Sequence, residues 1–159
     1  LEAYSSTPSD KKLIYLFLGA NGSGKSTLIA NLYRNKKLDM PYISPDIEEN
    51  IPFHDKINSL IKSGKGFVCE INSPNDEIKY IMNLAWSLGY KVFPVLIHTN
   101  NSEINVQRIQ KRAKFTKEEF DKNEIRKNYT NSLNFALSIK NSISEVYNNS
   151  LDTSLSLFK

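Results

Sequence analysis

The chain has 159 residues, of which 40% are hydrophobic and 24% charged, and its formal net charge is +4. This length and composition predict a single globular domain over residues 1–159 and exclude a disordered or collagen-like chain. One cysteine excludes an internal disulfide and a cysteine-rich zinc site, and it favours a reducing, cytoplasmic setting. No apolar run approaches the length of a membrane span, and residues 1–11 form a polar extension unlike a secretory signal.

Short apolar runs and amphipathic segments alternate along the chain, which is the pattern of a parallel sheet covered by helices. Strands are predicted over residues 13–18, 41–43, 66–71, 91–98, 143–147 and 155–158. Helices are predicted over residues 25–33, 54–62, 101–112 and 121–140, and over a segment that Gly89 ends. Ser73 is the expected cap of that segment, with Pro74 at its first helical position. The expected fold is a three-layer α/β sandwich of the P-loop NTPase kind, with helices on both faces of a mainly parallel sheet.

Two helical stripes and one strand residue are expected in the core. Cys69 lies inside a predicted strand and is interpreted as a core residue. The stripes of the third and the last helix are Ile78, Ile81, Met82 and Ala85, and Ile125, Tyr129, Leu133, Ala136 and Leu137.

A complete phosphate-binding motif, G-x-x-x-x-G-K-[ST], follows the first predicted strand and opens the first helix. Its glycines allow the backbone to curl so that successive N–H groups point at phosphate oxygens, and the helix adds its positive end. Lys25 is predicted to reach the β- and γ-phosphates, and the Ser26 hydroxyl to bind Mg²⁺. The predicted nucleotide-binding residues are Gly19, Ala20, Asn21, Gly22, Ser23, Gly24, Lys25, Ser26 and Thr27.

The rest of the chain narrows the kind of P-loop protein. It contains neither the Asp-x-x-Gly switch nor the Asn-Lys-x-Asp base reader of a GTPase. A short chain with a basic segment late in the sequence is typical of a small kinase, in which a basic lid closes over ATP and an acceptor. That lid is expected at about residues 105–122. The remaining basic residues are spread out, so nucleic acid is not an expected partner.

Five stretches in order resemble the zeta toxin family of P-loop kinases. They are residues 17–27, 42–46, 66–70, 88–92 followed by Arg108 and Arg112, and 125–133 followed by 146–150. The resemblance covers about residues 13–150. It implies an ATP- and Mg²⁺-dependent kinase for a small hydroxylated substrate such as the nucleotide sugar UDP-N-acetylglucosamine. It also suggests a protein antitoxin that covers the ATP site.

Candidate residues beyond the loop each have a functional and a structural interpretation. Asp46 matches the family's catalytic acid and could accept the proton of the attacking hydroxyl, or it could cap a helix. Glu70 ends an apolar strand, where ligands of parallel sheets bind, so it is a candidate for the substrate or for a magnesium-bound water. The alternative for Glu70 is an ion pair with a surface lysine.

Three arginines are candidates for contacts with phosphate oxygens or substrate. Arg108 and Arg112 share a helix face and could offset charge in the transition state, with Arg112 preferred as a catalytic residue. Arg126 is a further candidate for substrate binding, and each of the three could instead be a solvated helix residue.

Two other functions remain open at this point. The acceptor could be a nucleoside, a sugar or a polynucleotide end. The chain departs from the family pattern after Glu70 and at Asn128, so an inactive ATP-binding module that acts through a protein partner is the other alternative.

Overall fold

The computed structural model describes residues 11–44, 52–117 and 119–150. It contains a five-stranded sheet in the order β2-β3-β1-β4-β5, with every pair of neighbours parallel. The strands are β1 (Leu13–Leu18), β2 (Tyr42–Ile43), β3 (Phe67–Ile71), β4 (Lys91–His98) and β5 (Glu145–Asn148). The helices are α1 (Lys25–Arg34), α2 (Phe53–Ser63), α3 (Asp76–Ser87), α4 (Ser102–Thr116) and α5 (Lys122–Ser138), followed by the 3₁₀ turn η1 (Lys140–Ser142). The predicted α/β sandwich is therefore confirmed.

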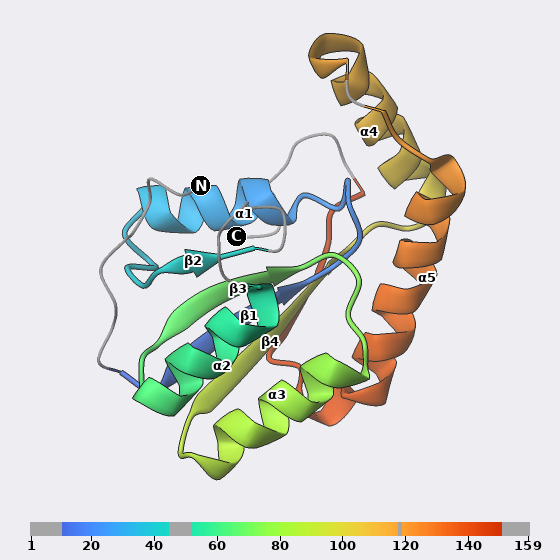
Figure 1. Cartoon of the computed structure of the whole chain (residues 1–159). Coiled ribbons are helices and arrows are strands. Elements are labelled where there is room, and N and C mark those ends of the chain that lie inside the picture. The colour runs from blue at the N-terminus through green and yellow to red at the C-terminus, as the bar shows by residue number, and fades with distance from the viewer. Residues whose placement is uncertain (1–10, 45–51, 118, 151–159) are drawn as a thin grey trace.

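Helices cover both faces of the sheet (Figure 1). On one face, α2, α3 and α5 pack against alternate residues of β1, such as Leu16 and Leu18. On the other face, α1 packs through Leu28 and Ile29 against Phe17. Because strand side chains alternate in direction, β1 contributes to both layers, and this explains its nearly continuous apolar sequence.

Helix α4 extends beyond the sheet and contacts the rest of the molecule mainly through its first half (Figure 1). Val106 and Ile109 form a small apolar cluster with Ile125 of α5. This contact seats the start of α4 beside the loop that follows β1. No helix within the described ranges has the length and apolar character needed to cross a membrane.

Helix ends account for most differences from the sequence-based prediction. The cap of α3 is Asn75, two residues after the predicted Ser73, and its Oδ1 accepts from the N–H groups of Glu77 and Ile78 at 3.0 and 3.4 Å. Asn75 has the extended backbone that a cap requires, and Pro74 therefore precedes the helix instead of occupying its first position. Helix α4 continues to Thr116, four residues past its predicted end.

The last helix was predicted slightly too long. It ends at Ser138, so Lys140 belongs to the 3₁₀ turn, and Leu137 has 66% of its surface exposed instead of lying in the buried stripe. The predicted core position of Cys69 and the whole buried stripe of α3 are confirmed. The strand predicted at residues 155–158 lies outside the described residues.

The buried thiol of Cys69 gives a direct test of the core. Burial, and secondarily the adjacent Glu70 carboxylate, raises the pKa of the Cys69 thiol far above its ordinary range. Since the thiolate is the reactive form, we expect Cys69 to resist a thiol-specific reagent such as Ellman's reagent in native buffer and to react with one equivalent in denaturant. The chain has no other cysteine, so the signal is unambiguous. Rapid labelling of the native protein would contradict the core assignment.

Candidate active site

The phosphate loop lies where the strand order of the sheet reverses. In the sheet, β1 pairs with β3 on one side and with β4 on the other. The crevice at the carboxyl end of β1 is therefore the expected ligand site of an open α/β sheet. Residues 19–24 turn through this position and lead into α1. Gly22 and Gly24 have φ values of 82° and 99°, a left-handed backbone that other residues rarely adopt.

The first turn of α1 has features that suit an anion. Gly24 is its cap and supplies no side-chain hydrogen bond, and the first turn contains no acidic residue. Each of the other described α-helices has an acidic residue there. The N–H groups and positive end of α1 are thus left without a carboxylate of their own, which suits a phosphate.

Lys25 lies across the loop as the motif predicts. Its side chain is only 3% exposed, and Nζ donates a hydrogen bond to the carbonyl oxygen of Ala20 at 3.1 Å. The ammonium is therefore held beside the loop backbone, where a bound phosphate chain would meet it.

The carboxylate of Glu70, at the end of β3, accepts hydrogen bonds from two hydroxyls. Ser26 Oγ donates to Oε1 at 2.7 Å, and the Tyr42 hydroxyl donates to Oε2. Glu70 is buried, whereas Ser26 is exposed. The structure thus brings together Ser26 and Glu70, which are 44 residues apart, and adds Tyr42, which sequence reasoning missed.

The Ser26–Glu70 pair fits a magnesium ion by its chemistry. Mg²⁺ prefers oxygen ligands and usually binds through one or two protein groups, substrate phosphates and water. A serine hydroxyl can offer a lone pair to the ion while its proton remains bonded to Glu70. In the part of the chain that the structure describes, no cluster of three or more His, Cys, Asp or Glu side chains forms a metal site.

The arginine candidates lie in three different environments. Arg108 donates to the carbonyl oxygen of Gly22 at 3.2 Å, so it touches the loop itself. Arg112 lies one turn further along α4, is exposed, and lines a cavity of about 220 Å³ together with Asn21 and Asn128. Asn21 is the loop residue that lines this cavity, and its other lining residues belong to α4, α5 and the segment between them.

Arg126 forms an ion pair with Glu103 of α4. Its Nε and Nη2 donate to Glu103 at 2.7 and 3.3 Å, and both side chains are about half exposed. Arg126 would have to leave Glu103 to bind a substrate. Asp46, the predicted catalytic acid, lies outside the described residues, although β2 ends at Ile43 beside Cys69, next to Glu70.

The predicted lid segment at residues 105–122 is partly helical. Its first part, up to Thr116, belongs to α4, and Lys117 ends that helix in a left-handed conformation. Closure of this segment over a nucleotide stays a prediction.

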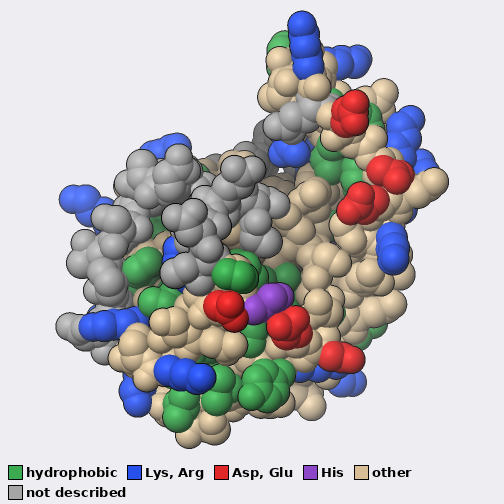
Figure 2. Space-filling model, viewed as in Figure 1, with side chains coloured by type: hydrophobic (Ala, Val, Ile, Leu, Met, Phe, Trp, Pro, Cys, Tyr) green, Lys and Arg blue, Asp and Glu red, His purple; other side chains and the backbone are tan. Residues whose placement is uncertain are grey.

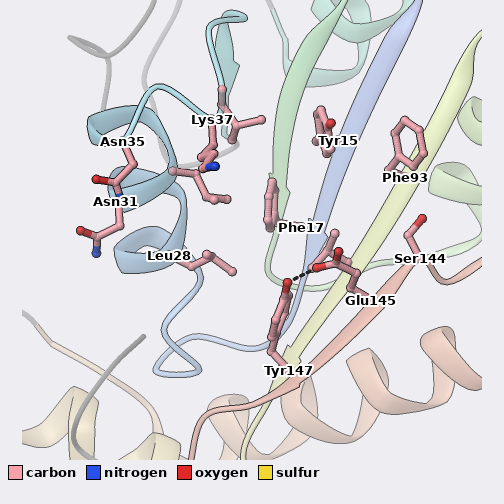
Figure 3. A pocket seen from close by; sticks show the side chains of 13 residues that line it. Tyr15, Phe17, Leu28, Asn31, Asn35, Lys37, Phe93, Ser144, Glu145 and Tyr147 are labelled. Carbon is pink, nitrogen blue, oxygen red and sulfur yellow. Dashed lines mark hydrogen bonds between the residues drawn. The ribbon is translucent and has the colours of Figure 1, made fainter. Parts of the chain in front are cut away.

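A further cavity lies outside the phosphate loop. It measures about 660 Å³ and lies between α1 and strands β1, β4 and β5, where Tyr15, Phe93 and Tyr147 line it (Figure 3). None of its lining residues belongs to the loop at residues 19–27. The loop is the candidate active site, because the glycine-rich backbone, Lys25 and the buried carboxylate of Glu70 converge there.

Comparisons with known proteins support the fold. No family model and no curated protein matches the chain. A putative kinase from Chloroflexus aurantiacus J-10-fl aligns with a TM-score of 0.55 and 17% identity, over 74% of this chain and 76% of that chain. A chain of the Pnkp1/Rnl/Hen1 RNA repair complex aligns with a TM-score of 0.63 and 17% identity, over 80% of this chain and 46% of that one. Together with the phosphate loop between β1 and α1, these similarities establish a P-loop fold.

The Arg126–Glu103 pair predicts a measurable titration. The hydrogen bond from Arg126 is the largest cause that lowers the pKa of Glu103. A lowered carboxyl pKa stabilises the folded state above the ordinary pKa, and this contribution is lost as the pH falls through the lowered value. We expect Arg126→Gln to return the Glu103 pKa toward its ordinary value, as measured by NMR titration.

Lys127→Gln removes the same charge from the neighbouring, exposed position on α5 and serves as the control. The Glu103 pKa should be much less affected in that variant. An unchanged Glu103 pKa in Arg126→Gln would show that the ion pair does not persist in solution.

Proposed function

We propose that the chain is an ATP- and Mg²⁺-dependent kinase that transfers the γ-phosphate of ATP to a hydroxyl of a small substrate. The observation that carries the proposal is the convergence of a complete phosphate loop with the Ser26–Glu70 hydrogen bond at the carboxyl end of β1. Both aligned structures share the fold, and one of them is described as a putative kinase. Within this class, the resemblance to zeta toxins favours UDP-N-acetylglucosamine as acceptor and an antitoxin protein as partner.

The described residues have distinct parts in such a transfer. The loop N–H groups and Lys25 bind the phosphate chain and offset the charge that develops on its oxygens. Ser26 and Glu70 would hold Mg²⁺, which neutralises phosphate charge when it is bound. The Tyr42 hydroxyl donates to the second carboxylate oxygen of Glu70 and so fixes the direction of the carboxylate.

Three residues are proposed for the acceptor side of the site. Asp46 follows β2, the strand that neighbours β3, and is proposed to accept the proton of the attacking hydroxyl. Arg112 opens onto the cavity beside Asn21 and is proposed to meet the transferring phosphoryl group. Arg108 already touches the loop, and its proposed contribution is to hold charge close to the phosphates.

Loss of the loop ammonium should abolish nucleotide binding. We expect Lys25→Ala to remove most ATP affinity, because a nearly buried positive charge aimed at the phosphates is lost. Isothermal titration with ATP and Mg²⁺ measures this directly, and a thermal unfolding curve checks the fold. Lys56→Ala, on α2, removes a lysine outside the site and serves as the control. Equal ATP affinity in Lys25→Ala and wild type would refute the assignment of the loop.

A polynucleotide 5′-hydroxyl is the second candidate acceptor, and one surface favours it. Residues 108–117 carry five basic and no acidic side chains, and the Phe115 ring at the far end of α4 is 85% exposed. Lys and Arg side chains gather over this projecting end (Figure 2). Basic residues around an exposed aromatic ring suit a single strand whose phosphates and bases they contact.

An acceptor panel separates these candidates. The protein is incubated with radiolabelled ATP and Mg²⁺ and with UDP-N-acetylglucosamine, a nucleoside, or a 5′-hydroxyl oligonucleotide, and the labelled product is identified. We expect UDP-N-acetylglucosamine to be labelled and Phe115→Ala to leave that rate unchanged. Labelling of the oligonucleotide, lost in Phe115→Ala but not in Tyr80→Ala, would identify the polynucleotide instead. ATP binding without any labelled product would favour the inactive module.

A further inference from the structure

Three consecutive carbonyl groups of the phosphate loop accept hydrogen bonds from side chains of distant segments. Asn105 Nδ2 donates to Asn21 O at 2.9 Å, Arg108 Nη1 to Gly22 O at 3.2 Å, and Asn149 Nδ2 to Ser23 O at 3.0 Å. The first two donors belong to α4, and the third follows β5. The loop is therefore bonded from its outer side over its three central residues.

These bonds orient the N–H groups that a phosphate would use. In a planar trans peptide, the carbonyl of one residue and the N–H of the next point in opposite directions. Holding the carbonyls of Asn21 and Ser23 outward turns the N–H groups of Gly22 and Gly24 inward. The intervening N–H of Ser23 donates to Ala20 O at 3.1 Å. Asn105 and Asn149 thus set the two inward donors.

The amide of Asn105 is itself fixed. Its side chain is fully buried, and its Oδ1 accepts from Thr99 Oγ1, which leaves Nδ2 for the loop. The Thr99 carbonyl accepts in turn from the Tyr129 hydroxyl of α5 at 2.7 Å. A continuous chain of hydrogen bonds therefore links α5, the end of β4, the start of α4 and the loop.

Asn149 is held in a comparable way at the end of β5. Its backbone N–H donates to His98 O at 2.7 Å, and its side chain is 5% exposed. Among the described residues its Oδ1 has no hydrogen-bond partner, so its contribution to the loop is the Nδ2 donor.

Both amide residues approach the loop where it lacks a side chain. A Cβ at Gly22 would lie 2.6 Å from the backbone oxygen of Asn105, and a Cβ at Gly24 would lie 2.2 Å from Asn149 Nδ2. The glycines of the motif thus admit these two residues as well as a ligand.

We infer that Asn105 and Asn149 are positioning residues that preset the phosphate loop for anion binding without touching the anion. The inference rests on the proposed function only in that the loop binds phosphates. It makes phosphate affinity depend on how α4 and the end of β5 are seated, because both segments supply the donors. A loop that is already ordered loses little conformational entropy when a phosphate binds.

The test uses inorganic tripolyphosphate, which carries the phosphate chain of ATP without the base. Asn105→Leu and Asn149→Leu each remove one donor at similar volume and add no charge. In Asn105→Leu, the single hydroxyl proton of Thr99 can donate to Asn101 O, which lies 2.8 Å from Oγ1. We expect the Kd for tripolyphosphate, measured by isothermal titration, to rise about tenfold in each variant, as for the loss of one hydrogen bond. Gln107→Leu, on the exposed surface of α4, should bind as wild type.

The readouts distinguish positioning from a general structural role. A destabilised fold lowers the number of binding sites per chain, whereas a disordered loop raises the Kd at full stoichiometry. Folded Asn105→Leu and Asn149→Leu with a wild-type Kd would overturn the inference. If one variant does not fold, the other decides. If wild type binds neither ATP nor tripolyphosphate, the proposed function fails first.

A measurement on the wild-type protein needs no substitution. The side-chain amide NMR signals of Asn105 and Asn149 should be protected from exchange, and their shifts should move when tripolyphosphate binds. Unprotected signals that are insensitive to tripolyphosphate would also overturn the inference.

Discussion

The position of β1 in the sheet is the constraint on which the rest of the site depends. Because β1 lies between β3 and β4, its carboxyl end receives contributions from both halves of the chain. The strand must be apolar on both faces to hold this central place, and Phe17 and Leu18 satisfy the two layers. The loop that follows can then meet Glu70 from one side and α4 from the other. None of these groups is near the loop in sequence.

The Ser26–Glu70–Tyr42 arrangement shows how a buried charge is tolerated. A carboxylate that leaves water needs hydrogen bonds to both oxygens, and the two hydroxyls supply them. One of these hydroxyls is the residue that the motif assigns to the metal. A cation bound at Ser26 would lie close to this carboxylate, and the burial of Glu70 would keep solvent from screening their attraction.

Local signals in the sequence predicted the five described strands, the loop and most of the core. The motif and its strand-to-helix context depend only on neighbouring residues, and β4 has the predicted bounds, residues 91–98. Local sequence patterns could not predict the tertiary contacts of the site. Nothing in the local pattern distinguishes Asn105 from the other asparagines of an asparagine-rich chain, and only the packing of α4 against the loop places its amide there. The ion pair of Arg126 could not be predicted either, because its partner Glu103 lies on another helix.

The close contacts at Gly22 and Gly24 have a consequence for how this sequence can vary. Each glycine shares its space with a residue more than 80 positions away, so substitutions at the two members of a pair are not independent. At Gly24 the obstacle is the tip of a side chain, and a smaller residue at position 149 would relieve the clash, although not the strain of a positive φ. At Gly22 the obstacle is backbone, and no change at position 105 alone can remove it. Among related chains, glycine at position 22 should therefore persist whatever residue occupies position 105, and glycine at position 24 should persist because of its positive φ even where position 149 carries a smaller residue.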